Sequence, residues 1–116
     1  MTPRHVAEAY FTAWETGDFE TLRSLLADDV TFAGALGTAS GAEECVQGLR
    51  GMSEILDRIE VQMRLADDTD VMTWFDLHTT VAPPTPTVNW SRVVDGKVTQ
   101  IRVTFDPRDI IASSAE

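Results

Sequence analysis

Apolar residues recur at helical spacing in three stretches of the first half of the chain. The first stretch begins after Thr2 and Pro3, which are typical of a helix start, and ends at Gly17. Its apolar stripe has the spacing of a helix with one buried face and consists of Val6, Ala9, Tyr10, Ala13 and Trp14. Asp18 is a typical N-cap for a second helix, and residues 41–57 have the pattern of a third. Three N-terminal helices are therefore predicted.

Alternating apolar and polar residues predict strands in the second half of the chain. Four strands follow from this pattern: Ile59–Leu65, Val71–Val81, Val88–Val94 and Lys97–Phe105. Asp95 and Gly96 separate the last two strands and are typical of a tight hairpin turn. The segment Pro83–Pro86 separates the middle two, because proline cannot donate a hydrogen bond to a strand ladder. A further short strand is expected at Val30–Phe32, between the second and third helices.

The order of the predicted elements favours an α+β domain over a parallel βαβ architecture, because helices and strands are largely segregated along the chain. A length of 116 residues is enough for one domain, which we expect over residues 1–110, followed by a flexible tail over 111–116. A curved antiparallel sheet wrapped around three helices forms a cone. Such a cone leaves a cavity at its open end that side chains need not fill.

The chain carries 9 basic and 19 acidic residues, a net charge of −10. This balance disfavours nucleic acid and anionic membranes as partners, since both require a basic surface. The single cysteine, Cys45, excludes an internal disulfide and any multi-cysteine metal site, and two distant histidines give no convincing metal site either. Neither a signal peptide nor an apolar run of about 20 residues is present, so a cytoplasmic location is expected.

The candidate chemistry lies on the strand Val71–Val81. Asp76 and His78 are two residues apart and share a strand face with Trp74. If that face lines the cavity, desolvation would raise the pKa of Asp76 and suit it to act as an acid or base, with His78 as its partner. The alternatives are exposure on the outer face of the sheet, or a salt bridge from Asp76 to Arg92 or Arg102.

Strand alternation also predicts which residues of the last two strands point inward. If Ile101, Val103 and Phe105 face the core, Arg102 and Thr104 face outward. Asn89 and Ser91 point inward if Trp90 and Arg92 point outward. An exposed tryptophan on a sheet face indicates a covered surface, so we expect a homodimer through the outer sheet face.

Three segments carry a resemblance to a known family: AYFTAWETGDFETLRSLLADDVTF, GAEECVQGL and VVDGKVTQIRVTFDPRDI. In this order and spacing they resemble the nuclear transport factor 2-like superfamily, and within it the SnoaL-like and ketosteroid isomerase-like branch. The resemblance extends over nearly the whole chain. It implies a cone-shaped, cystatin-like α+β fold, and it leaves the reaction open, since one scaffold serves isomerases, cyclases, epoxide hydrolases and non-enzymatic binders.

The resemblance also implies roles for individual residues. Tyr10 and Asn89 fall where ketosteroid isomerases keep the two donors that stabilise a developing oxyanion. The general base of those isomerases corresponds to Gly34, which favours a binding protein without chemistry.

Two other branches of the superfamily give alternative templates. Asp76 matches one acid of the limonene epoxide hydrolases, whereas Val103 beside Arg102 stands in place of their second acid. Phe32 and Gly34 stand where those enzymes keep a pocket tyrosine and asparagine. The pairing of Asp76 with His78 is also compatible with the acid and histidine that SnoaL-type polyketide cyclases use.

Two hypotheses follow. The first is a cofactor-independent enzyme acting by general acid/base chemistry on a small, largely apolar carbonyl or epoxide compound, as an isomerase, cyclase or epoxide hydrolase. Its expected catalytic residues are Asp76, His78, Tyr10 and Asn89. Its expected substrate-binding residues are Trp14, Phe32, Leu36, Trp74, Ser91, Val103 and Phe105. The second hypothesis is a non-catalytic small-molecule-binding or assembly module of the same fold.

Overall fold

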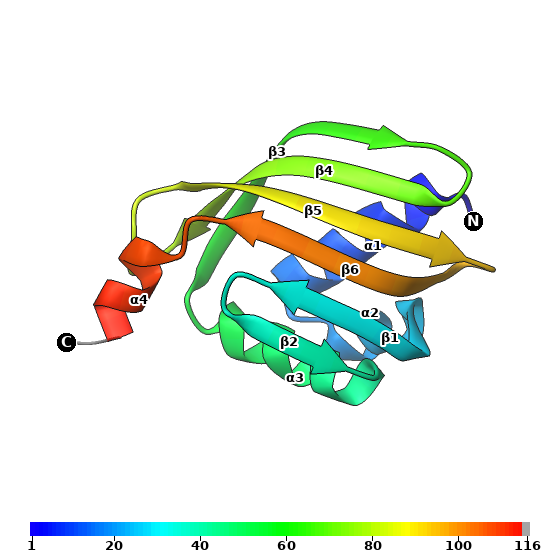
Figure 1. Ribbon diagram of the computed structural model, residues 1–116, viewed down its shortest axis with the longest axis horizontal. Helices are drawn as coiled ribbons and strands as arrows, with labels where there is room; N and C mark the ends of the chain where they lie inside the picture. The colour runs from blue at the N-terminus through cyan, green and yellow to red at the C-terminus, as the bar shows by residue number, and fades with distance from the viewer. Residues whose placement is uncertain (115–116) are drawn as a thin grey trace.

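Three helices pack against one side of a curved, unclosed six-stranded sheet (Figure 1). The structure, a computed structural model, describes residues 1–114. Its elements in chain order are α1 Pro3–Thr16, α2 Phe19–Leu25, β1 Leu26–Gly34, β2 Gly37–Ser40, α3 Ala42–Ser53, β3 Leu56–Ala66, β4 Asp70–Thr79, β5 Thr85–Val94, β6 Lys97–Phe105 and α4 Arg108–Ser114. The predicted α+β cone and its three N-terminal helices are confirmed.

The predicted ends of the first helix and the predicted start of the second are confirmed, whereas the third helix ends at Ser53 and not at residue 57. The Thr2 hydroxyl accepts a hydrogen bond from the backbone N–H of His5 at 3.2 Å, which caps the start of α1. Gly17 ends α1 with φ 75°, a left-handed conformation that glycine adopts without a steric penalty. The Asp18 carboxylate then accepts from the N–H of Thr21 at 3.1 Å and caps α2. These local signals turn the chain sharply between α1 and α2.

The strand order is β2-β1-β6-β5-β4-β3, and one pair departs from the antiparallel prediction. β1 runs parallel to β6, so the sheet is mixed. The β2 strand, which pairs with β1 as a hairpin, is not among the strands that the sequence pattern predicts. The last hairpin is as predicted: β6 spans Lys97–Phe105, and its turn has φ 52° at Asp95 and 77° at Gly96.

A bulge in β3 changes which side chains of that strand face inward. Val61 pairs with Phe75, but the register shifts there and Met63 pairs with Trp74. The predicted alternation from Ile59 to Leu65 is therefore interrupted. Met63 and Leu65 are exposed on the outer face, because a bulge inserts one residue and reverses the faces beyond it.

The segment Arg108–Ser114 forms a short helix, and its residues 111–114 belong to the predicted tail. Ile110 is buried and packs against the hydrophobic core, so it anchors α4 to the body of the protein. The rest of the predicted tail, residues 115–116, lies outside the described residues. In the described part of the chain, no helix is long and apolar enough to cross a membrane.

Candidate functional site

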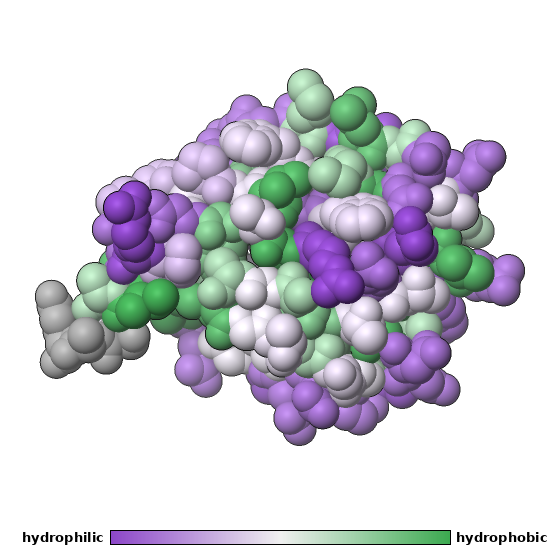
Figure 2. Space-filling model, viewed as in Figure 1, coloured by the Kyte–Doolittle hydropathy of each residue, from purple (hydrophilic) through white to green (hydrophobic). Residues whose placement is uncertain are grey.

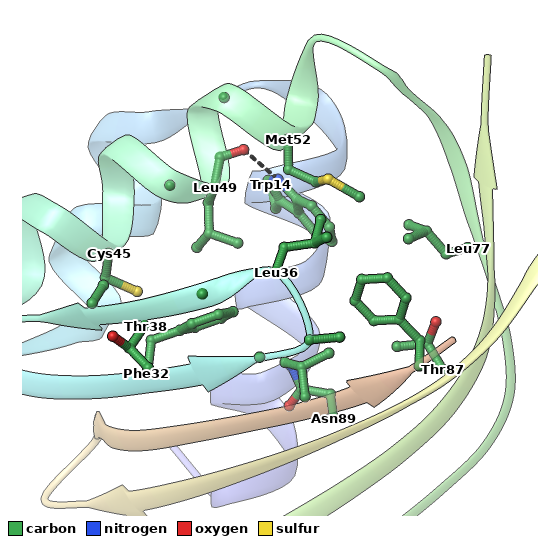
Figure 3. Close-up of a pocket in the computed structure, with 18 of the residues that line it drawn as sticks. Trp14, Phe32, Leu36, Thr38, Cys45, Leu49, Met52, Leu77, Thr87 and Asn89 are labelled. Atoms are coloured by element: carbon green, nitrogen blue, oxygen red, sulfur yellow. Dashed lines mark hydrogen bonds between the residues drawn. The ribbon is translucent and has the colours of Figure 1, made fainter. Parts of the chain in front are cut away.

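A cavity of about 630 Å³ lies between the concave face of the sheet and the helices, and Figure 3 shows residues that line it. Seven of the residues expected at a site line this cavity: Tyr10, Trp14, Phe32, Leu36, Asn89, Val103 and Phe105. Most of the lining is apolar. Its rim is formed by exposed residues of the β1–β2 hairpin and α3, namely Leu36, Gly37, Thr38, Glu44, Gln47, Gly48 and Gly51.

The aromatic wall on the helix side is fixed by Trp14. Its Nε1–H donates to the backbone carbonyl of Leu49 at 2.8 Å, as the dashed line in Figure 3 marks. This buried hydrogen bond ties α1 to α3. It leaves the indole ring beside Met52 and Leu49 at the cavity wall, with its only polar atom already paired.

The polar groups inside the cavity centre on Asn89, whose side chain is 3% exposed. The Ser91 hydroxyl donates to Asn89 Oδ1 at 2.7 Å, and the Tyr10 hydroxyl lies beside the same amide. Because Oδ1 already accepts from Ser91, the amide orientation presents N–H groups toward Tyr10 and the cavity. Ser91 does not itself line the cavity and instead positions Asn89 from behind.

Tyr10 is a neutral phenol in this environment. Burial raises the pKa of its hydroxyl, nearby Cys45 raises it further, and the hydrogen bond from Asn89 opposes both effects. With its oxygen contacted by the Asn89 amide, the Tyr10 proton remains available for an acceptor in the cavity. Tyr10 and Asn89 together make a pair of donors that suits a carbonyl or hydroxyl oxygen.

Other ionisable lining residues supply no base to the cavity interior. Burial raises the pKa of the Cys45 thiol to about 11, which keeps it protonated at neutral pH. Glu44 is exposed at the rim, where its carboxylate accepts from the N–H of Ser40 at 3.4 Å. A side chain at Gly34 would bring its Cβ to 3.0 Å from the Phe32 ring, so the position matched to the isomerase base is closed by Phe32.

The expectation that Asp76, His78 and Trp74 line the cavity is wrong. Met72 pairs with Trp90 and Asp76 with Pro86, which places this face of β4 on the outer side of the sheet. Trp74 is 48% exposed there.

On that outer face each of the two candidate chemical groups has a polar neighbour. The Asp76 carboxylate accepts from the Gln62 amide at 3.1 Å. His78 Nε2 lies 3.2 Å from a carboxylate oxygen of Glu60. Asp76 therefore lies on the outer face, where it is half-buried, while Arg92 pairs with Asp70 instead.

Several lining residues were not singled out from the sequence: Cys45, Leu49, Met52, Phe75, Leu77 and Thr87. Alternation could have found three of them. Phe75 and Leu77 occupy the strand face opposite Asp76, and Thr87 lies two residues before Asn89 on the same face of β5. To predict the lining residues of α3, one must know which face of the helix points to the cavity, and the sequence pattern alone does not give this.

The family model of the SnoaL-like domain matches residues 7–101, most of the chain. The chain belongs to the SnoaL-like domain family. This places the SnoaL-like domain described here in the nuclear transport factor 2-like superfamily, as the resemblance implied. No curated protein matches the sequence.

Solved structures similar to this SnoaL-like domain include a protein from Kribbella flavida DSM 17836, with 27% identity and a TM-score of 0.90 over 96% of this chain and 92% of that one. An LEH-like epoxide hydrolase of M. tuberculosis is 23% identical, with a TM-score of 0.77 over 94% and 86% of the two chains. A putative ketosteroid isomerase from Kribbella flavida is 20% identical, with a TM-score of 0.76 over 89% and 76%. At such identities the last two show the shared fold alone.

Proposed function

We propose that this SnoaL-like domain binds a small, uncharged, largely apolar molecule that carries a carbonyl or hydroxyl oxygen, and that it does so without chemistry. The observation that carries the proposal is the composition of the cavity. Its interior offers two hydrogen-bond donors, from Tyr10 and Asn89, and its ionisable side chains are a neutral phenol and a protonated thiol.

The size and charge of the cavity favour this class of ligand. A volume of about 630 Å³ lies within the range of small-molecule sites, which are mostly apolar with a few placed polar groups. A charged ligand would lose its hydration without meeting an opposite charge inside, which is costly. Glu44 at the rim also disfavours anions.

We expect Tyr10→Phe to weaken binding of the uncharged ketone 9-fluorenone by roughly threefold to tenfold, because one hydrogen bond to the carbonyl is lost. The ring stays in place, since its edge-to-face contact with Phe11 at 5.1 Å needs no hydroxyl. Isothermal titration calorimetry with 9-fluorenone and with fluorene, which lacks the carbonyl, separates the two contributions. Fluorene binding is expected to be unchanged.

The matched control is Asp76→Asn, which alters the outer face and leaves the cavity intact. It is expected to bind 9-fluorenone as the unaltered protein does. Failure of the unaltered protein to bind either compound would refute the proposed function. Equal affinity of Tyr10→Phe for the ketone would refute only the role of Tyr10.

A second candidate, an acid/base enzyme, is favoured by one observation: the paired donors Tyr10 and Asn89 also suit a developing oxyanion. The interior of the cavity holds no base for such an enzyme, so the base would be a residue of the rim. Glu44 is the carboxylate at that rim. Exchange of the α-protons of 1-indanone for deuterium in D₂O distinguishes the two candidates. A binding protein leaves the exchange rate at the buffer value, whereas an enzyme accelerates it and loses the acceleration in Glu44→Gln.

We also propose that two copies of the chain pair through the outer sheet face. Cross-strand partners Met63 with Trp74 and Leu65 with Met72 form an exposed cluster, here called the outer apolar cluster. Figure 2 shows hydrophobic side chains on this face of the molecule over β3. A second copy is the partner that a self-complementary patch around a two-fold axis accepts most simply.

Trp74→Glu is expected to convert the dimer to a monomer, because it places a charge at the centre of the outer apolar cluster. Sedimentation velocity measures the mass in solution, which is 12.8 kDa for the monomer and twice that for the dimer. Thr12→Glu, on the exposed face of α1, adds the same charge elsewhere and should leave the dimer intact. A monomeric unaltered protein at high micromolar concentration would rule out this interface.

A further inference from the structure

Two glycines of α3, Gly48 and Gly51, lie at the rim of the cavity. Together with Glu44 they occupy one row along the helix, at i, i+4 and i+7. The neighbouring row carries the side chains of Cys45, Leu49 and Met52, which form the cavity wall. The glycine row is therefore where α3 presents bare backbone at the entrance.

The fold itself gives no reason for glycine at these two positions. Both belong to α3 and are absent from the glycines with positive φ, which are Gly17, Gly37, Gly41 and Gly96. A Cβ built at Gly48 or Gly51 meets no atom within 4 Å. Inside a helix, glycine is the least favourable residue after proline, so both glycines weaken α3 with no gain in packing.

Gly34, another glycine of the cavity lining, shows the contrast. A Cβ there would approach the Phe32 ring to 3.0 Å and Val103 to 3.8 Å, so neighbouring side chains already use the space. At Gly48 and Gly51 the space is empty and opens on the cavity mouth. Across that mouth lies the tip of the β1–β2 hairpin, with Leu36 exposed.

We propose that Gly48 and Gly51 determine the size of the ligand, by keeping the space between α3 and the β1–β2 hairpin free for the part of the molecule that extends from Asn89 to the rim. The inference rests on the proposed binding function. A ligand of that length contacts the bare backbone of α3, which only glycine allows at such close range. A ligand confined to the Asn89 end does not reach these positions.

The test is a graded series at Gly48 with two uncharged ketones, cyclohexanone and 9-fluorenone, titrated by calorimetry. Gly48→Leu is expected to weaken 9-fluorenone binding by about tenfold, because the added side chain occupies the space that the larger ketone needs. Gly48→Ala is expected to show a smaller loss in the same direction. Binding of cyclohexanone is expected to stay unchanged in both variants.

Gly48→Ala, which weakens binding of the larger ketone, is expected to stabilise the protein without ligand. Gly48→Ala is expected to raise the melting temperature by about 4 °C, since alanine is the better helix former and clashes with nothing. Thr12→Ala on the exposed face of α1 is the control: it also favours its helix and lies outside the cavity lining. It should leave the affinity for 9-fluorenone unchanged.

The outcomes separate this inference from the function on which it rests. If the unaltered protein binds neither ketone, the proposed function is wrong and the inference is wrong with it. If the unaltered protein binds 9-fluorenone and Gly48→Leu binds it equally well, only the role of the glycines is overturned. Selective loss of the larger ketone, together with a more stable α3 in Gly48→Ala, supports the inference.

Discussion

Trp14→Ala is expected to lower the free energy of unfolding by about 4 kcal/mol, the largest effect of any single substitution considered for this protein. The indole is 6% exposed and belongs to the core, so its removal leaves a void beside the existing cavity. It also removes the hydrogen bond that joins α1 to the Leu49 carbonyl of α3. A loss of this size is a large fraction of the roughly 5–15 kcal/mol that stabilise a typical domain.

Urea unfolding followed by circular dichroism measures this loss without relying on tryptophan fluorescence. Trp14→Phe is the matched variant, because it keeps an aromatic ring and removes the N–H donor, for an expected loss of about 1 kcal/mol. A Trp14→Ala protein within 1 kcal/mol of the unaltered one would show that α1 and α3 do not depend on this contact.

Local rules predicted the parts of the fold whose causes lie within a few residues. The helix ends at Thr2 and Gly17 follow from capping, and the β5–β6 hairpin follows from the two turn residues at Asp95 and Gly96. The bounds of β6 agree with the sequence pattern residue for residue. In each case the signal and the structure it produces are adjacent in the chain.

The face of β4 that lines the cavity could not be predicted in the same way. Alternation correctly grouped Asp76 with His78 and Trp74, but it does not say which face of the sheet is concave. The register with β5 decides this, because residues directly opposite each other in an antiparallel pair share a face. Trp90 was expected to face outward, and its cross-strand partner Met72 therefore faces outward too. Asp76 lies on the same face of β4 as Met72, so it also faces outward.

The remaining differences also come from interactions between distant parts of the chain. The bulge in β3 reverses the faces of Met63 and Leu65, although the sequence alternates without a break. β2 forms because β1 offers it a pairing edge, and α4 is held by the contact of Ile110 with the core. Tyr10, Asn89 and Cys45 come together from α1, β5 and α3, so only the folded chain reveals their contact.

Alkaline pH between about 9 and 11 is expected to destabilise this protein. The pKa of the Cys45 thiol rises from its usual 9.0 to about 11 on folding, because burial penalises the thiolate. As the pH rises from 9 to 11, the unfolded chain loses this proton before the folded protein does. The protonated thiol contributes about 3 kcal/mol to the free energy of unfolding. This contribution is fully present below pH 9 and is lost as the pH rises to 11.

Burial raises the pKa of Tyr10 as well, which adds a loss of the same sign once unfolded tyrosine ionises near pH 10. Melting temperatures at pH 7.5, 9, 10 and 11 measure the combined effect. Cys45→Ala and Tyr10→Phe each remove one titrating group. The drop in melting temperature from pH 9 to pH 11 should therefore be smaller in each variant than in the unaltered protein, even if the variant is less stable at pH 7.5. Parallel profiles for all three proteins would mean that neither group is held neutral by the fold. The donor pair at the end of the cavity depends on that neutrality, because an ionised Tyr10 has no proton to give to a ligand.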